Sequence, residues 1–255
     1  MKWKRSGSWV AGILVTAALL VAGTGVTFGE DDPAKPQGTA AETEPALGSP
    51  DLTQARQIVD KAQMTLENFG KTKEMSPFRD LLKDAKAVFI APNLMKFAFF
   101  IGGSGGNGVL MVKDDKTGKW SGPAFYTIGG ISFGLQIGGE SSAVVLLAMT
   151  ERGVSSLLST SVKLGADASI AAGPVGMGAQ AATENISADI LSFSRAKGAY
   201  AGISLDGALV KVRNGLNQAY YNTKVTPTEI LIKRTVRNPH SDRLIAEISR
   251  ETVKG

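Results

Sequence analysis

The chain has 255 residues, of which 43% are hydrophobic and 20% are charged, a composition typical of a globular protein. Its net charge of +5 favours an anionic partner such as a phospholipid surface, although an ordinary imbalance of solvated surface charges gives the same number. The absence of cysteine excludes disulfides, thiolate chemistry and an acylated cysteine anchor, and a single histidine leaves zinc and redox metals without their usual ligands.

The N-terminus has the pattern of a secretory signal. Three basic residues within the first five precede an apolar run from Trp9 to Ala22, and Thr27 and Gly29 stand at the −3 and −1 positions of a cleavage site. An uncleaved anchor is the alternative, but the run is short for a spanning helix and is interrupted by glycine. We therefore expect a signal peptide at residues 1–29 and export to the periplasm or the extracellular space.

The chain after the leader divides by composition into three parts. Residues 30–50 contain four prolines and five acidic residues with one lysine, and they read as an acidic linker. Residues 51–235 carry the periodic patterns of a folded domain, and residues 236–255 read as a polar C-terminal tail. The basic surplus therefore belongs to the folded part.

Two helices are predicted at the start of the domain. Ser49 and Ser76 each precede a proline, the pattern of an N-cap residue with proline at the first helical position. The first helix has apolar residues at spacings of three and four, ending near Gly70 as a C′ residue: Leu52, Ala55, Val59, Ala62, Leu66 and Phe69. Its polar face mixes charges of both signs, which favours packing on a sheet over lying on a membrane. The second helix turns four residues inward: Phe78, Leu81, Leu82 and Ala85.

Strands dominate the rest of the domain, together with a hairpin loop at Asp114–Gly118 and a short helix at Glu151–Leu158. Besides Trp120–Gly139, strands are predicted at Val88–Ile90, Met95–Ile101, Val109–Val112, Ala143–Met149, Leu164–Ile170, Leu191–Ser194 and Ile203–Val212, the last with a turn at Asp206-Gly207. Short connections favour antiparallel pairing, and many glycines favour a curled sheet. The predicted fold class is α+β, with N-terminal amphipathic helices packed on a glycine-rich, strongly curved, barrel-like antiparallel sheet.

The stretch Trp120–Gly139 is the most informative of these patterns. Apolar residues from Ile131 to Ile137 alternate with polar residues and glycine, as in a strand with one apolar face. Gly129-Gly130 and Gly138-Gly139 bracket that strand and indicate bends or bulges of a curved sheet.

These twenty residues resemble the signature of the SYLF lipid-binding domain family. Three further blocks resemble it in the same order: Lys163–Gly178, Ser192–Gly198 and Ala219–Pro227. The resemblance covers roughly Asp51 to Lys233 and implies binding to phosphoinositides or other anionic lipids. The chain lacks the SH3 or FYVE domain that eukaryotic members often carry, which argues against their actin role here.

Two glycine motifs suggest catalysis on paper. Gly103, Gly105 and Gly108 satisfy the dinucleotide pattern G-x-G-x-x-G, and Ser104 is the centre of a G-x-S-x-G. Both motifs require a following helix, whereas Val109–Val112 is strand material, so a glycine-rich loop or bulge is favoured. The only candidate base for Ser104 is His240. We expect no enzyme, cofactor or metal, and a hydrolase using Ser104 is a second alternative.

Three aspartates are candidates for a metal site or for a structural role. Asp114 and Asp115 are predicted to lie in a turn, because no bidentate glutamate stands at the spacing of an EF-hand loop. Asp167 is predicted to be a buried acceptor of backbone N–H groups at a sheet bend.

The sequence thus predicts a non-enzymatic protein that binds anionic membrane lipids through a basic surface, with no nucleic-acid partner. A structural or protein-binding component of the cell envelope is the alternative. The preferred contacts are Arg195 and Lys197, where strand neighbours and Gly198 let a phosphate approach closely. The other candidates are basic residues near apolar positions: Lys211, Arg213, Lys83, Lys86 and Lys96.

Overall fold

A computed structural model describes residues 49–98, 102–132, 138–176 and 187–253. The predicted signal peptide and nearly all of the predicted linker lie outside these residues, as do residues 133–137 of the second predicted strand in Trp120–Gly139. Within the described residues, no helix is both long and apolar enough to span a membrane.

Helix α1 (Pro50–Lys71) begins as predicted, since the Ser49 Oγ accepts a hydrogen bond from the Leu52 amide at 3.2 Å. Its predicted stripe is buried from Ala55 to Phe69, joined by Ile58 and Thr65, while Leu52 is only half-buried. The predicted C′ role of Gly70 is wrong, because the helix continues to Lys71. Gly70 serves packing instead, since a Cβ there would collide with the Glu251 carboxylate.

Helix α2 (Ser76–Asp84) follows a 3₁₀ turn (η1, Lys73–Met75). The N-cap position belongs to Met75 and no side chain caps this end, so the predicted capping by Ser76 is wrong. The four residues predicted to face inward are all buried.

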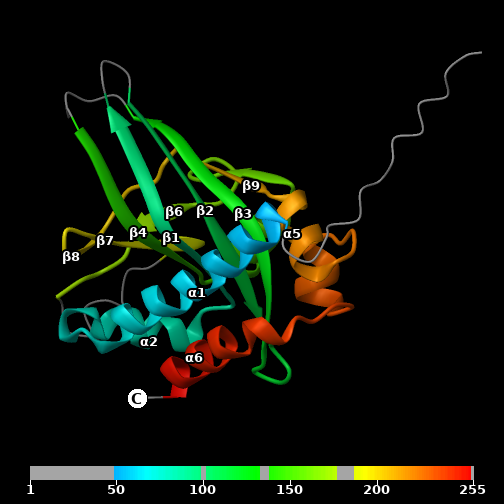
Figure 1. Ribbon diagram of the computed structural model, residues 1–255. Helices are drawn as coiled ribbons and strands as arrows, with labels where there is room; N and C mark the ends of the chain where they lie inside the picture. Colours follow the sequence, from blue (N-terminus) through cyan, green and yellow to red (C-terminus); the bar gives the residue numbers. More distant parts are fainter. Residues whose placement is uncertain (1–48, 99–101, 133–137, 177–186, 254–255) are drawn as a thin grey trace, which may run out of the picture. The chain divides into compact units, whose positions relative to one another are not determined.

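A nine-stranded sheet forms the centre of the domain (Figure 1). Its long strands are β1 (Ala87–Ala98), β2 (Gly102–Lys113), β3 (Trp120–Ser132) and β4 (Gly138–Ala148). The short strands are β5 (Ser161–Lys163), β6 (Ile170–Ala172), β7 (Ile190–Ala196), β8 (Ala199–Gly202) and β9 (Leu209–Val212). The order is β5-β9-β3-β2-β1-β4-β7-β6, with β8 also on β7. The sheet is a strongly curved half-barrel, which confirms the α+β prediction. The predicted antiparallel sheet is wrong in one respect, because β6 and β7 pair in parallel whereas the other described strand pairs are antiparallel.

The register shift in β1 does not lie where the glycines predicted a bulge. Strand β3 pairs continuously with β2 through Gly129 and Gly130, so the bulge predicted there is wrong. The register shifts instead in β1 between Ile90 and Met95, around Pro92, whose nitrogen cannot donate to a ladder. The two strands predicted on either side of Pro92 are therefore one bulged strand.

The glycine motifs lie inside a strand. Gly103, Ser104, Gly105 and Gly108 all belong to β2, which continues to Lys113 without a helix. The loop or bulge expected there is wrong, and neither a dinucleotide turn nor a nucleophile elbow is present in this stretch.

Two predicted strands in the second half differ from the structure. Leu164–Ile170 is mainly a turn, with Gly165 at φ +84° and a bridge between Leu164 and Ala168. The Ile203–Val212 segment contains only β9, and the Asp206-Gly207 turn before it is confirmed. Helix α3 (Glu151–Leu158) has the predicted bounds.

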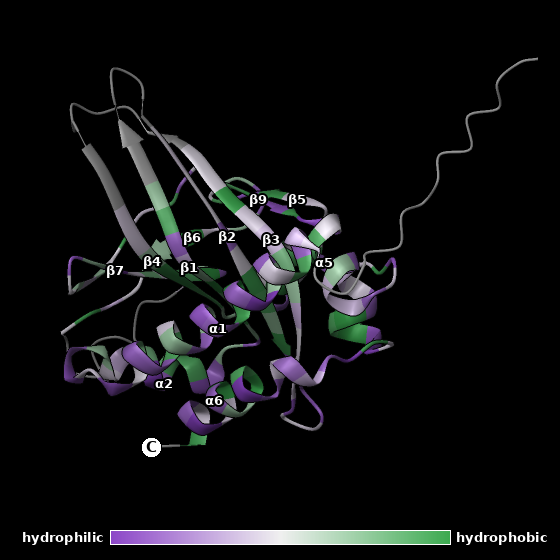
Figure 2. Ribbon diagram, in the orientation of Figure 1, coloured by the Kyte–Doolittle hydropathy of each residue, from purple (hydrophilic) through white to green (hydrophobic). Residues whose placement is uncertain are grey.

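Separate apolar cores cover the two faces of the sheet. One lies under α1, α2 and α6 (Asp242–Val253) and includes Val88, Ile90 and Phe193, and the other lies on the opposite face around Phe89. Helix α6, within the stretch assigned to a tail, contacts α1 and α2 and buries Leu244 and Ile248 completely. In Figure 2 these helices alternate between hydrophobic and hydrophilic residues, as expected when one face is buried.

The segment between β9 and α6 consists of one short helix and two helical turns. It contains α5 (Asn214–Tyr221), a π-helical turn (η2, Glu229–Lys233) and a 3₁₀ turn (η3, Pro239–Ser241). Helix α5 packs against the first half of α1, and the π-helical turn packs against β3.

Candidate functional site

The two preferred basic residues lie on the β7–β8 hairpin. Ala196 pairs with Ala199, which leaves Lys197 and Gly198 as a two-residue turn with positive φ angles of 49° and 84°. A turn with both φ angles positive matches the twist of the flanking strands and demands glycine or a tolerant residue. The hairpin therefore holds Arg195 on the strand and Lys197 at the exposed tip.

Arg195 is held by an aromatic stack. Its guanidinium carbon lies 5.6 Å from the ring centroid of Tyr200, whose hydroxyl donates to the Asn68 carbonyl at 3.0 Å. Tyr200 also meets the fully buried Phe69 edge to face, with ring centroids 5.0 Å apart. This chain of contacts fixes Arg195 relative to α1. The Arg195 Nε is buried without a hydrogen-bond partner among the described residues.

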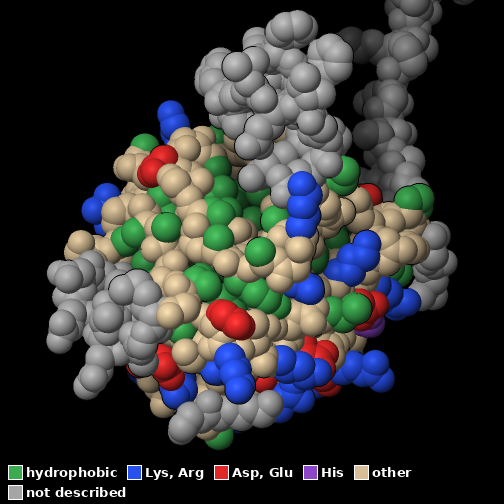
Figure 3. Space-filling view, turned by 90° about the vertical axis from the view of Figure 1, so that its left-hand side faces the viewer, with side chains coloured by type: hydrophobic (Ala, Val, Ile, Leu, Met, Phe, Trp, Pro, Cys, Tyr) green, Lys and Arg blue, Asp and Glu red, His purple; other side chains and the backbone are tan. Residues whose placement is uncertain are grey.

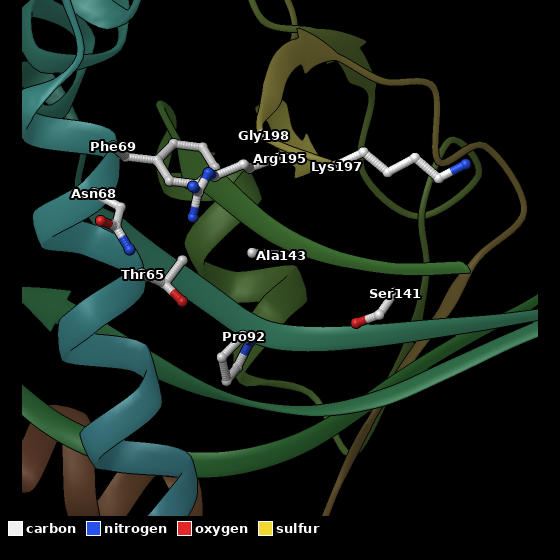
Figure 4. A pocket seen from close by; sticks show the side chains of 9 residues that line it. All are labelled: Thr65, Asn68, Phe69, Pro92, Ser141, Ala143, Arg195, Lys197 and Gly198. Atoms are coloured by element: carbon white, nitrogen blue, oxygen red, sulfur yellow. The ribbon is translucent and has the colours of Figure 1, made fainter. Parts of the chain in front are cut away.

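A pocket of about 290 Å³ lies between α1 and the sheet beside this arginine. Figure 4 shows Arg195 pointing between α1 and the strands, while Lys197 extends outward from the turn. Helix α1, strands β1 and β4 and the hairpin all contribute to the lining: Thr65, Asn68, Phe69, Pro92, Ser141, Ala143, Arg195, Lys197 and Gly198. A buried N–H and a cation beside short hydroxyl and amide side chains form a suitable setting for an anion.

Sequence reasoning identified the basic half of this pocket and missed the other half. Thr65 and Asn68 are polar positions beside the apolar stripe of α1, and nothing in a single sequence pairs them with Ser141 of β4. Only the folding of α1 across the sheet brings them together. Asp189, described below, was missed for the same reason.

Four of the remaining candidate residues do not line this pocket: Lys83, Lys86, Lys211 and Arg213. Lys83 pairs with Asp80 at 3.1 Å. Lys86 bridges Glu151 at 2.7 Å and Asp115 at 3.2 Å, and these hydrogen bonds, that of Glu151 first, raise the pKa of the Lys86 amine. Both lysines line a second pocket of about 510 Å³, whose lining contains acidic as well as basic side chains.

The β1 and β9 candidates have different positions. In the backbone register Lys96 stands between Ser104 and Glu140. Lys211 is exposed on β9, and Arg213 donates to the Asn107 side chain at 3.1 Å.

The carboxylates have structural roles. Asp167 accepts the Lys163 amide at 2.7 Å as predicted, but it is exposed, so the predicted burial is wrong. Asp189 is a buried carboxylate, and it accepts hydrogen bonds from Thr150 at 2.6 Å and from Ser169 at 2.7 Å. These bonds, that of Thr150 first, lower the pKa of Asp189. Asp114 lies in the predicted turn, where hydrogen bonds from Thr117 and then Arg234 lower its pKa to about 2.

The described residues contain neither a Ser104–His240 pair nor a cluster that could hold a metal ion. The Ser104 hydroxyl faces the Gly130 carbonyl at 3.5 Å, whereas His240 contacts Tyr220 at 3.2 Å and Asp60 at 3.3 Å. Ser104 and His240 therefore form no nucleophile–base pair. In the same residues, no group of three acidic, histidine or cysteine side chains could hold a metal ion.

The fold defines a class: an α+β domain in which helices cover a strongly curved sheet. Residues 129–251 match the family model Ysc84, described as "Las17-binding protein actin regulator". The chain thus contains a domain of the Ysc84/SYLF family, which confirms the resemblance.

Relatives with this domain are named as binding or regulatory proteins. Protein YSC84 of Saccharomyces cerevisiae is 31% identical over 182 residues, which are 69% of this chain and 38% of that protein. LAS seventeen-binding protein 3 of the same species is 31% identical over 180 residues, 69% of this chain and 38% of that protein. SH3 domain-containing YSC84-like protein 1 of Homo sapiens is 27% identical over 166 residues, 64% of this chain and 48% of that protein. The chain spans less than half the length of these relatives.

Proposed function

We propose that this chain is a non-enzymatic lipid-binding protein that associates with anionic phospholipids through the Arg195–Lys197 hairpin. One observation carries the proposal: Arg195 is fixed by Tyr200 beside an open pocket, and its Nε has no partner among the described residues. Lys197 adds a second cation at the exposed tip of the same hairpin. Lys83 and Lys86 contribute less, because acidic neighbours already neutralise them.

Flotation with vesicles tests this proposal. Phosphatidylcholine vesicles with and without phosphatidylglycerol are compared, for wild type and for the double variant Arg195→Gln and Lys197→Gln. Each basic residue near an anionic surface contributes about 1 kcal/mol, so the double variant is expected to bind the anionic vesicles on the order of tenfold more weakly. Raising the salt concentration should weaken wild-type binding in the same direction.

A matched control removes two charges elsewhere. Lys116 and Lys119 are exposed on the β2–β3 loop, and their double change to glutamine alters the net charge by the same amount. This control should retain most binding if the hairpin is the contact. Equal losses in both double variants would point to net charge alone, and no loss in either would refute the proposal.

A protein partner is the second candidate, favoured by the relatives named as Las17-binding. Under this alternative the chain binds a protein of the cell envelope and shows no preference for anionic vesicles. A defined complex in solution, together with absent flotation, would replace the lipid proposal.

We also propose that the protein is exported. The support is the basic, apolar and small-residue pattern of residues 1–29. Mass spectrometry of the protein from its native source should find a mature N-terminus near Glu30 in an extracytoplasmic fraction. An intact Met1 in a membrane pellet would contradict export with cleavage.

A further inference from the structure

One row of paired residues crosses the sheet on the face that the Arg195 pocket opens onto. Ser141 of β4 pairs with Met95 of β1, Met95 with Gly105 of β2, Gly105 with Gly129 of β3, and Gly129 with Leu209 of β9. Directly paired residues place their side chains on the same face of a sheet. Ser141 lines the Arg195 pocket, so the whole row lies on that face.

The row carries two exposed apolar side chains, Met95 next to Ser141 and Leu209 at the far end. Leu209 and Met95 are 52% and 37% exposed, and they are two of the five large hydrophobic side chains that are exposed among the described residues. Between them stand two residues without side chains. Figure 3 views the molecule from the side of β4, β7 and β8 and shows hydrophobic side chains gathered on this face among separate basic ones.

Gly105 is a glycine that the fold itself does not require. A Cβ at Gly105 would meet nothing within 4 Å, whereas a Cβ on the neighbouring Gly106 would collide with the Asn93 carbonyl. Glycine within a strand weakens it, and it often marks a place where a ligand or another backbone approaches closely. The open space above Gly105 is therefore a trough between Met95 and Leu209.

The shape of this trough suits a single extended acyl chain better than the flat surface of a bilayer. Helix α1 contacts β1 and β2, and its Thr65, Asn68 and Phe69 line the pocket on the same face, so the helix stands as a wall beside the row. A flat bilayer resting on α1 would not reach the floor. Five neighbouring strands span about 19 Å at about 4.8 Å per step. One acyl chain occupies half of a bilayer core, about 15 Å.

We propose that this face is a groove that holds one acyl chain of an anionic lipid, with the headgroup at Arg195 and Lys197. The inference rests on the proposed function and extends it, because the protein then carries a single lipid molecule rather than only resting on a membrane. The basic residues lie at the β4–β7 end of the row, and the apolar residues lead away from them. Along this row of paired residues the basic end and the apolar residues follow one another as they do in a phospholipid, while Lys211 lies on β9 beside the far end.

Lipid uptake tests the groove. The protein is incubated with phosphatidylcholine vesicles that contain pyrene-labelled phosphatidylglycerol, separated by size exclusion, and assayed for pyrene fluorescence per chain. Wild type should retain about one labelled lipid per chain. Gly105→Phe fills the trough and should reduce uptake more than tenfold, since each methylene kept out weakens binding several-fold. Gly105→Ala adds one methyl group to open space and serves as the matched control, with uptake near wild type.

A second variant guards against misfolding of Gly105→Phe. Met95 and Leu209 are exposed, so changing both to glutamine should leave the thermal transition in place while it reduces uptake. Flotation with anionic vesicles without lipid retention would overturn the groove and leave the proposed function standing. Equal uptake by Gly105→Phe and Gly105→Ala, with both folded, would also overturn it. Absence of both flotation and uptake would refute the proposed function itself.

Discussion

The four long strands have two halves of different character. In one half a rung runs through Ala124, Leu110, Phe89 and Leu146, all fully buried, and cores cover both faces of the sheet. In the other half the rung of Gly129, Gly105, Met95 and Ser141 carries little side chain. A Cβ at Gly105 would meet open space, whereas a Cβ at Gly129 would approach the Ser104 carbonyl. The backbone hydrogen bonds between neighbouring strands continue from one half into the other. The ladder therefore extends the sheet beyond its cores, and stability and binding can reside in different halves.

The strongest way to break this comparison is a cavity in the packed half. Phe89 is fully buried and its ring lies 6.4 Å from that of Tyr126. Phe89→Ala should lower the free energy of unfolding by about 3–5 kcal/mol, because the lost contacts leave a cavity. Urea denaturation measures this loss. A loss below about 1 kcal/mol would mean that the core around Phe89 is not closed.

Adjacent glycines of β2 sharpen the comparison within one strand. Gly106→Ala places a methyl group against the Asn93 backbone at the β1 bulge and should destabilise by about 1–3 kcal/mol. Gly105→Ala places the same methyl group in open space and should be neutral or stabilise by up to about 1 kcal/mol. Thermal melts of the two variants give the comparison directly. Equal shifts would show that the two faces of β2 are equally filled.

The pH dependence of the free energy of unfolding tests the contribution of Asp189, which lies next to the packed half. Asp189 lies one residue before β7 and joins Thr150, the N-cap of α3, to Ser169. Asp189→Asn should cost about 1.5 kcal/mol at neutral pH, since the hydrogen bonds lose their charged acceptor. The folded-state pKa is lowered, so this stabilisation is present above the unfolded-state value of about 3.9 and is lost as pH falls below it. Wild type should therefore lose more stability than the variant between pH 5 and pH 2.

The smallest effect is expected in the open half. Met95 is partly exposed and packs against no closed core, so Met95→Ala should change the free energy of unfolding by about 0.5 kcal/mol or less. Denaturation beside the Phe89→Ala variant provides the measurement. A loss comparable to that of a core residue would place Met95 in the packed half.

Local signals predicted local structure well and long-range placement poorly. The Ser49-Pro50 start of α1, the Asp114–Gly118 turn and the bounds of α3 follow from hydrogen bonds within a few residues. The glycine pattern did not predict the bulge correctly, since β3 pairs continuously through Gly129-Gly130 and the register shift lies around Pro92 of β1. A glycine can mark a bend of its strand or a close approach by a neighbouring segment. Which of the two applies depends on the atoms next to its Cα, and these belong to another part of the chain.

The candidate site divides in the same way. Arg195 and Lys197 could be selected as candidates because they are close together in the sequence, in a strand that is followed by a glycine. The structure places both in one hairpin. Their companions Thr65, Asn68 and Ser141 come from distant segments and required the fold. Helix α6 was missed because its buried Leu244 and Ile248 are few among many charged residues.

The empty space above Gly105 also bears on how such a domain can change over generations. A substitution there meets no neighbouring atom, so it can alter what the face accepts without first disturbing the core. Most positions that touch a ligand also support the fold, and mutations at them usually reduce stability. A position free of that constraint allows descendants of one ancestral domain to acquire different preferences by single amino-acid changes.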